Sequence, residues 1–310
     1  MAQQKPTAAL PSSGLGLSGI ARAQRRFPIW LEPYIDLVQH KPLATFGGAV
    51  MLIMLFVALF ADVLAPYDPV EPNMAARLRA PDSSHLLGTD QLGRDELSRI
   101  IYGAQISLFV GLGAVLIGTS GATIIGGVSG YFGGKVDTAV QRVVDAVLAM
   151  PALILLLAIV SVLGPSLLNI VIALSFRAAI GESRTIRGAV IGIKENQYVD
   201  AARAIGSSNL HILVHYILPN VTAPIMVLAS VSLGGAILAE ASLSFLGFGV
   251  PPPAPSWGGM LSLEGRRFMI VAPWLAIAPG LSLSLVVFGI NVLGDGLRDV
   301  LDPRLRGTRG

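Results

Sequence analysis

Two histidines are the first residues of this sequence whose types and spacing could support chemistry. His211 and His215 are four residues apart, a spacing that places two imidazoles on one face of a helix, where they can bind a metal ion. A zinc protease motif would carry glutamate directly after the first histidine, but the sequence has Ile212 there, and no third ligand is apparent. A buried or interfacial histidine pair is therefore the favoured interpretation.

Glu240 is an acidic residue deep within a long apolar segment. An ionisable group inside a bilayer costs about 2.5–3.5 kcal/mol on insertion scales for the comparable aspartate, so it is a candidate for function. Glu240 could line a translocation path and contact a substrate amine. It could also form a hydrogen bond to a neighbouring helix, or lie nearer the outer surface, and these alternatives stay open.

Other catalytic and nucleotide-binding signatures are absent. The sequence has no Gly-x-Ser-x-Gly and no His-Glu-x-x-His, and all four histidines lie outside the apolar segments, which argues against an intramembrane enzyme. A phosphate loop is missing because the Gly134-Lys135 pair is followed by Val136. The absence of cysteine excludes disulfides, zinc–thiolate sites and iron–sulfur clusters. We expect no catalytic residue, metal or cofactor in this chain.

The composition predicts a membrane protein. Of the 310 residues, 53% are hydrophobic and only 13% are charged, and the mean hydropathy is +0.68. A soluble domain carries roughly a quarter of charged residues. The net charge of +3 and the aromatic content of 6% make nucleic acid an unsuitable partner. No polar stretch is long enough to form a soluble domain with its own core.

Uncharged segments of about 20 residues predict six transmembrane helices. The longest uncharged stretch, 146–176, is divided at Gly164-Pro165 because proline breaks a helix. Arg177 and the charges after it indicate that the fourth helix continues into the cytoplasm. The glycine-rich sequence 126–134 could let helices pack closely or form a flexible turn. The predicted spans are 43–63, 105–130, 138–163, 166 to beyond 177, 221–248 and 268–294.

These spans divide the chain into a cytoplasmic tail (1–42), a first helix (43–63), an external loop (64–104), a five-helix core (105–294) and a cytoplasmic tail (295–310). No apolar core precedes residue 43, so we expect no cleavable signal, and 30–40 predicts a helix at the membrane surface. With both termini cytoplasmic, 16 lysines and arginines lie inside and 6 outside. The positive-inside rule favours this orientation.

The segment 198–220, YVDAARAIGSSNLHILVHYILPN, is a polar and helix-prone interruption of the apolar sequence. Gly206 suits a left-handed helix end, and 207–209 offers N-cap residues for a second helix. Pro219 predicts a stop from which the chain turns back into the membrane. The second helix should present one apolar face, formed by Leu210, Leu213, Val214 and Ile217. We therefore predict two short helices that meet at a corner on the cytoplasmic side.

This segment resembles the cytoplasmic coupling loop, or EAA loop, of bacterial ABC importer permeases. The shared pattern is Asp200-Ala201-Ala202, Gly206 and Leu218-Pro219, with Asp200 in place of the usual glutamate. His215 aligns with a histidine often present late in this loop. The stretches 85–108, 241–261 and 294–307 resemble C-type permease subunits of dipeptide and oligopeptide importers, in the peptide/nickel family.

The resemblance implies a type I ABC importer permease fold and a set of partners. These partners are a homologous second permease, two cytoplasmic ATPases that hold ATP and magnesium, and an extracytoplasmic substrate-binding protein. The resemblance assigns contact with the ATPases to Asp200, Ala201, Ala202, Gly206, His215, Leu218 and Pro219.

The same resemblance favours di- and oligopeptides as substrates, with nickel chelates or glutathione as alternatives. Trp257, within a proline-rich external loop, could contact the binding protein or anchor the loop at the membrane interface. A stand-alone ion-coupled carrier is disfavoured because it would need several buried carboxylates and an inverted repeat.

Overall fold

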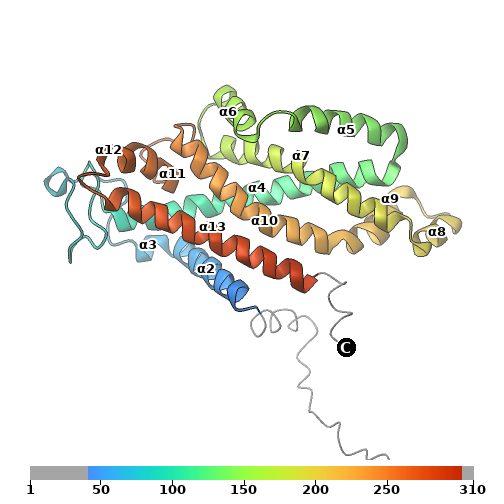
Figure 1. Ribbon diagram of the computed structural model, residues 1–310, viewed down its shortest axis with the longest axis horizontal. Helices are drawn as coiled ribbons and strands as arrows, with labels where there is room; N and C mark the ends of the chain where they lie inside the picture. Colours follow the sequence, from blue (N-terminus) through green and yellow to red (C-terminus); the bar gives the residue numbers. More distant parts are fainter. Residues whose placement is uncertain (1–40, 302–310) are drawn as a thin grey trace, which may run out of the picture.

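The computed structural model describes residues 41–301, and this part of the chain is an elongated bundle of helices (Figure 1). The β pairing in these residues is one isolated bridge between Thr89 and Asp95. The predicted all-α class is therefore confirmed. The surface helix predicted at 30–40 lies outside the described residues.

Five long helices form the bundle. They are α2 (Pro42–Leu59), α4 (Glu96–Phe132), α7 (Leu167–Lys194), α10 (Leu218–Phe245) and α13 (Trp274–Leu301). By length and apolar composition, 42–59, 96–132, 209–245 and 274–299 can each cross a membrane. A bent pair of shorter helices would make a fifth span. Large apolar side chains such as Leu52, Leu116 and Leu281 are exposed on the outward faces of these helices, as in helices that contact lipid.

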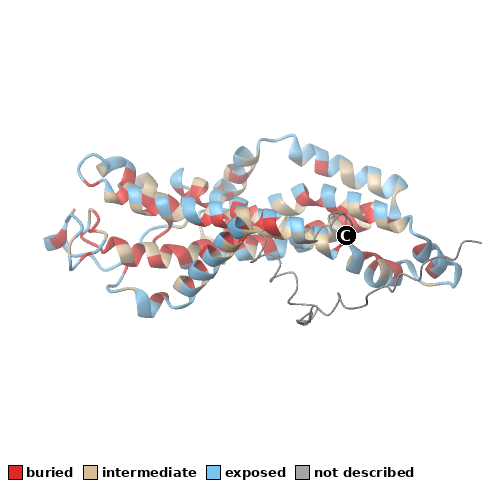
Figure 2. Cartoon of the chain, turned by 60° about the horizontal axis from the view of Figure 1, so that its bottom comes forward, coloured by how far each residue is buried: buried red, intermediate tan, exposed pale blue. Residues whose placement is uncertain are grey.

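Short elements connect the long helices and collect at the two ends of the bundle (Figure 1). One end carries α3 (Ala61–Leu64), η1 (Met74–Ala76), α11 (Trp257–Gly259), η3 (Met260–Gly265) and α12 (Arg266–Phe268). The other end carries α8 (Gln197–Ala204), α9 (Asn209–Ile212) and η2 (Leu213–Ile217). Figure 2 shows that buried residues follow the inward faces of the long helices, between these ends.

Two of the first four predicted spans differ from the helices of the structure. The second long helix begins at Glu96 rather than at 105, because the Asp95 carboxylate caps it by accepting the Ser98 N–H at 2.8 Å. The expected third span is two helices, α5 (Gly134–Leu148) and α6 (Ala152–Leu163), bent by 89° at a break that contains Pro151. The fourth helix, α7, continues without a break to Lys194.

Glycines allow α4 and α7 to pack closely. A Cβ at Gly126 would lie 2.5 Å from the Ser183 carbonyl oxygen, and one at Gly130 would lie 2.9 Å from the Arg187 carbonyl oxygen. Small residues at such spacing bring helix backbones together where lipid gives no hydrophobic drive. The next glycine, Gly133, has a φ of +64° and forms the turn into α5. The sequence 126–134 therefore provides both close packing and a turn.

Asp82 organises a tight turn in the segment between α3 and α4. Its Oδ1 accepts hydrogen bonds from the Ser84 hydroxyl at 2.6 Å and from the His85 N–H at 2.8 Å, and Arg79 contacts Oδ2. The Ser84 hydroxyl contributes most, and these donors together hold the pKa of Asp82 well below its usual range.

We expect Asp82→Asn to lower the thermal midpoint at neutral pH. A depressed pKa stabilises the fold above the unfolded-state value of about 4, and this contribution is lost as the pH falls through the lower folded-state pKa. The difference in thermal midpoint between the variant and the wild type should therefore begin to shrink below about pH 4, as measured by thermal unfolding at a series of pH values. A gap that stays constant with pH would show that the ionised carboxylate is not responsible.

Candidate functional site

The segment 197–217, here called the elbow, contains α8, a corner and α9 with its continuation. Gly206 forms the corner, with a φ of +83°. Its N–H donates to the Arg203 carbonyl at 2.9 Å, and the Ser207 N–H donates to the Ala202 carbonyl at 3.1 Å. This pair of bonds is a Schellman motif, which requires a left-handed residue and favours glycine. The predicted corner at Gly206 is confirmed.

The helix after the corner does not stop at Pro219. The Ser208 hydroxyl accepts the His211 N–H at 3.3 Å and begins α9, which continues through the π-turn η2 into α10. The Leu218 N–H donates to the Leu213 carbonyl, five residues back. Pro219 follows directly, as the second residue of α10, and the helix continues through it although proline supplies no N–H. The predicted turn at Pro219 is therefore wrong, and 209–245 runs as one 37-residue helical stretch.

The inner face of the elbow packs against the ends of α4 and α7. Its buried residues join Tyr131, Ile186 and Val190 in one hydrophobic cluster. The Tyr131 hydroxyl donates to Asn209 Oδ1 at 2.9 Å, and the Arg203 guanidinium lies 5.8 Å from the Tyr131 ring centroid. The elbow is therefore attached to the bundle on both sides of its corner. The elbow residues in the cluster are Val199, Ala202, Ile212, Leu213 and Ile217.

The outer face of the elbow exposes apolar side chains. The apolar face predicted for the second helix is split, because Leu213 and Ile217 are buried whereas Leu210 and Val214 are 71% and 43% exposed. Ile205, at the corner, is 79% exposed. Exposed apolar patches of this kind indicate a surface that contacts another molecule.

The other predicted residues of the elbow lie on different faces. Asp200 is exposed and pairs with Arg203 at 3.0 Å, and the N-cap position of α8 belongs to Asn196. Ala201 is exposed, whereas Ala202 is buried. The structure thus brings Asp200 and Ala201 to the surface and uses Ala202 for packing.

The two histidines stack on each other and remain exposed. Their ring centroids are 4.2 Å apart, and the His215 Nδ1 lies 3.3 Å from the His211 carbonyl oxygen. The described residues contain no group of three potential metal ligands. The arrangement is that of an aromatic pair on the elbow surface, so the pair is not buried within this chain, and the interfacial alternative stays a prediction.

Glu240 is fully buried in α10. Its Oε1 accepts the Ser244 hydroxyl at 2.7 Å, within the same helix, rather than a donor from a neighbouring helix. In the part of the chain that the structure describes, its Oε2 has no hydrogen-bond partner. Buried polar atoms are rarely left without a partner, so this oxygen requires an explanation.

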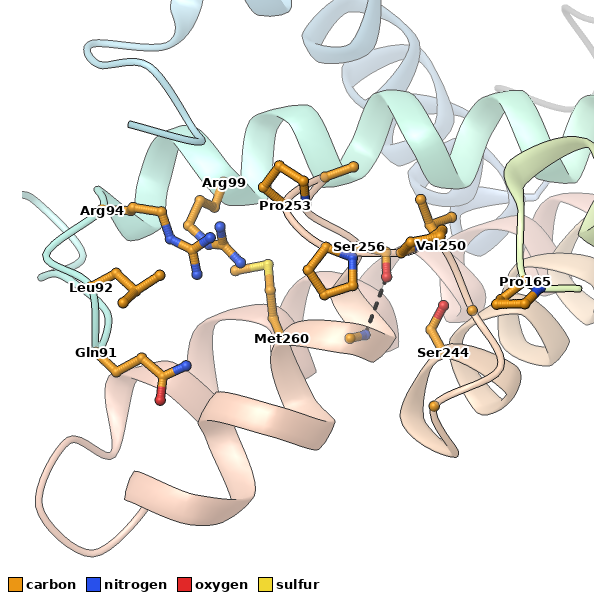
Figure 3. Close-up of a pocket in the computed structure, with 16 residues that line it drawn as sticks. Gln91, Leu92, Arg94, Arg99, Pro165, Ser244, Val250, Pro253, Ser256 and Met260 are labelled. Atoms are coloured by element: carbon orange, nitrogen blue, oxygen red, sulfur yellow. Dashed lines mark hydrogen bonds between the residues drawn. The ribbon is translucent and has the colours of Figure 1, made fainter. Parts of the chain in front are cut away.

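Beside Ser244 is a cavity of about 410 Å³, which we call the proline-loop pocket (Figure 3). It lies between the start of α4 and the loop that follows α10. Arg94 and Arg99 lie on one side of it, and Ser244 lies on the other. Its remaining lining residues are Gln91, Leu92, Pro165, Gly247, Gly249, Val250, Pro251, Pro252, Pro253, Ala254, Ser256, Gly259 and Met260.

Comparison with known families identifies the class of protein that carries this elbow. Residues 122–307 match the family described as the binding-protein-dependent transport system inner membrane component. The chain belongs to this family. Residues 39–81 of the permease also match the N-terminal transmembrane domain of oligopeptide transport permease C. The family consists of transport permease subunits rather than enzymes or cofactor-binding proteins. Its members are inner membrane components, and this permease is likewise a multi-pass protein of the bacterial inner membrane.

Relatives of known name share most of the permease's length. A dipeptide transport system permease of Alkalihalophilus pseudofirmus is 42% identical over 89% of this chain and 90% of its own. One from Haemophilus influenzae is 42% identical over 85% of this chain and 91% of its own. A glutathione transport system permease of Pectobacterium atrosepticum is 40% identical over 86% of this chain and 88% of its own.

The fold of the permease is also found in a solved transporter. The inward-facing MetNI methionine ABC transporter includes a chain with a TM-score of 0.50 and 17% identity, which covers 66% of the permease and 94% of that chain. At this identity, the similarity establishes the helical fold alone.

Glu182 of the permease is a buried carboxylate that the sequence did not single out. It accepts the Thr119 hydroxyl of α4 at 2.7 Å and the Ser232 hydroxyl of α10 at 2.6 Å. One side chain of α7 thereby links three long helices. In the sequence, Glu182 lies among arginines and resembles a charge on a helix that leaves the membrane. Its donors are 63 and 50 residues away, so no local pattern could reveal them.

Proposed function

We propose that this permease is one of two membrane subunits of an ATP-driven importer of di- and oligopeptides and forms half of the translocation path. The named relatives that transport dipeptides support the substrate class. The elbow carries the proposal, because it is braced against α4 and α7 and yet presents an unpartnered apolar surface. That combination suits an element that transmits force from a docked partner into the bundle.

The proposed topology has six spans and both termini in the cytoplasm. The four apolar helices and the bent pair α5–α6 account for five spans, and α7 is the sixth because it packs closely along α4. The excess of lysine and arginine, 16 against 6, supports an elbow on the cytoplasmic side. The proline-loop pocket, at the opposite end of the bundle, would then open toward the outside.

We propose that two cytoplasmic ATPases bind this permease and its homologous partner, one at each elbow, and hold the ATP and magnesium. Asp200, Ala201 and His215 are exposed on the elbow and are available for contact. Gly206 sets the corner, and Leu218 and Pro219 join the elbow to α10. Ala202 acts by packing the elbow against the bundle.

Replacing Ile205 by serine should weaken the attachment of the ATPase. Ile205 is 79% exposed at the corner, and burying an isoleucine side chain at an interface contributes about 1.5–3 kcal/mol, or at least about tenfold in affinity. The measurement is the amount of ATPase that co-purifies with the permease. Ile270→Ser is the matched control, because Ile270 is 94% exposed and follows α12, which lies at the opposite end of the bundle. Equal ATPase recovery from both variants would contradict docking at the elbow.

The test of the function is ATP hydrolysis by the purified complex, with and without an extracytoplasmic binding protein loaded with a peptide pool. Stimulation by the loaded binding protein is the expected result. Glutathione is the alternative substrate, because a glutathione permease is 40% identical, and it should be assayed beside the peptides. Stimulation by glutathione or by a nickel chelate alone would overturn the peptide assignment, and failure of any ATPase to co-purify would overturn the importer.

A further inference from the structure

The proline-loop pocket has the volume and mixed lining of a small-molecule site. Its volume of about 410 Å³ lies within the usual range for ligand pockets, about 300–1,000 Å³. Apolar side chains such as Leu92, Val250 and Met260 form much of its wall. Charged or polar groups converge on it from two opposite sides (Figure 3).

One side of the pocket carries two arginines. Arg94 and Arg99 are only 5% and 4% exposed, and both line the cavity. Asp90 holds them together, with its Oδ2 2.5 Å from Arg94 Nε and 3.5 Å from Arg99 Nε. The planar fork of a guanidinium matches the geometry of a carboxylate, and the interaction is stronger where water is excluded.

The opposite side of the pocket leads to a buried carboxyl group. Ser244 lines the cavity, and its hydroxyl donates to Glu240 Oε1 at 2.7 Å. The lone pairs of the same hydroxyl oxygen can accept a hydrogen bond from a ligand. Glu240 is fully buried, and within the described residues its Oε2 has no hydrogen-bond partner. An ammonium group beside Ser244 would bring a positive charge close to this carboxyl group, and an opposite charge nearby favours the carboxylate form.

Close backbone contacts fix the wall between these two sides. A Cβ at Gly249 would lie 1.8 Å from Ser244 Oγ, and one at Gly258 would lie 2.2 Å from the Ala241 carbonyl oxygen. The Trp257 indole N–H donates to the Ile100 carbonyl at 3.1 Å, which joins the loop to α4. The two sides are therefore held apart in the absence of ligand, and such preorganisation favours binding.

We propose that the proline-loop pocket binds a short peptide as a zwitterion, with its carboxylate at Arg94 and Arg99 and its ammonium at Ser244 and Glu240. The pocket receives the peptide from the binding protein before the peptide enters the path between the permeases. This inference rests on the proposed function and adds to it a recognition site for free peptide termini in the membrane subunit.

Binding is measured by protection of an introduced thiol. The chain has no cysteine, so Gln91→Cys places a single thiol of this subunit in the wall of the pocket. In the purified complex without binding protein, dialanine at about ten times its dissociation constant should slow labelling by a polar thiol reagent about tenfold, by mass action. N-acetylated and C-amidated dialanine should protect much less. Ile270→Cys, 94% exposed outside the pocket lining, is the control and should react at one rate throughout.

Two further variants test the charged sides. In the Gln91→Cys background, Glu240→Gln keeps the side-chain shape and should reduce protection by dialanine to that of the N-acetylated peptide. Arg94→Gln should reduce it to that of the C-amidated peptide. Equal protection by free and capped peptides, or none, would overturn the inference. Protection by unloaded binding protein alone would overturn it as well, because the pocket would then be a docking point for that protein.

The same complex separates the failure of this inference from the failure of the proposed function. Peptide uptake in the presence of binding protein, without any protection of Gln91→Cys, would contradict peptide binding in the pocket and would still support the importer function. Protection of the thiol without uptake or stimulated ATP hydrolysis would support peptide binding in the pocket and contradict the importer function.

Discussion

Replacing Gly206 by proline is expected to abolish the stimulation of ATP hydrolysis by loaded binding protein while the permease still inserts into the membrane. Proline fixes φ at about −65°, whereas Gly206 has a φ of +83°. Proline also removes the N–H that donates to the Arg203 carbonyl. Both bonds of the corner depend on that geometry. The native φ is incompatible with proline and one corner bond is lost, so we expect at least about a tenfold loss of coupling.

Gly206→Asn is the matched control for this change. No atom lies within 4 Å of a Cβ built at this position, so a side chain has room, and only the backbone conformation is tested. Asparagine adopts the left-handed conformation at low cost and should retain most of the coupling. Gly206→Ala should fall between the two. Intact coupling in the proline variant would show that the corner does not transmit motion.

Replacing Gly126 by valine is expected to disrupt the packing of α4 against α7. A Cβ at this position would lie 2.5 Å from the Ser183 carbonyl oxygen and 2.9 Å from the Arg187 backbone nitrogen. These are backbone atoms, which cannot rotate away, so the helices must separate. Overpacking typically costs about 1–3 kcal/mol, and separation here would also strain the bond between Thr119 and Glu182. The expected results are a large fall in thermal midpoint and a poor yield of purified permease.

Gly192→Val supplies the control, because it makes the same substitution on α7 at an open position. No atom lies within 4 Å of a Cβ at Gly192, so the change in helix propensity is similar and the steric conflict is absent. The Gly192 variant should melt close to wild type. Equal loss of stability in both variants would assign the effect to the backbone preference of glycine rather than to the helix contact.

Local sequence patterns predicted those features that depend on a few neighbouring residues. The apolar segments gave the long helices because each segment is long enough to form one. The corner at Gly206 was predictable because a glycine followed by N-cap residues specifies a Schellman end. The Glu240–Ser244 bond could also have been inferred, because the two residues are four positions apart in a helix.

Proline was the ambiguous signal in this sequence. At Pro219 it was interpreted as a stop, but the helix continues through this residue, directly after the π-turn η2. At Pro151 the same residue marks the 89° bend between α5 and α6, which the sequence analysis placed inside one span. Proline shows that the hydrogen-bond ladder changes, whereas the surrounding tertiary packing decides how.

Contacts between distant segments were beyond local reasoning. The proline-loop pocket joins Arg94 and Arg99 to Ser244 and the prolines that follow α10, and only the packing of α4 against that loop brings them together. The small separation of α4 and α7 likewise depends on which glycines face each other. The spacing of apolar residues predicts which face of a helix is buried, but it does not predict which other helix packs against that face.

The continuity of residues 209–245 makes the length of this stretch as constrained as its residue types. One end carries the exposed surface of the elbow, and the other carries Glu240 and Ser244. Each residue of an α-helix adds roughly 100° of rotation, so an insertion or deletion between the ends would turn one away from its neighbours. A π-turn accommodates one extra residue, and η2 places it within the elbow. We therefore expect relatives to keep the number of residues in this stretch as closely as they keep its residue types.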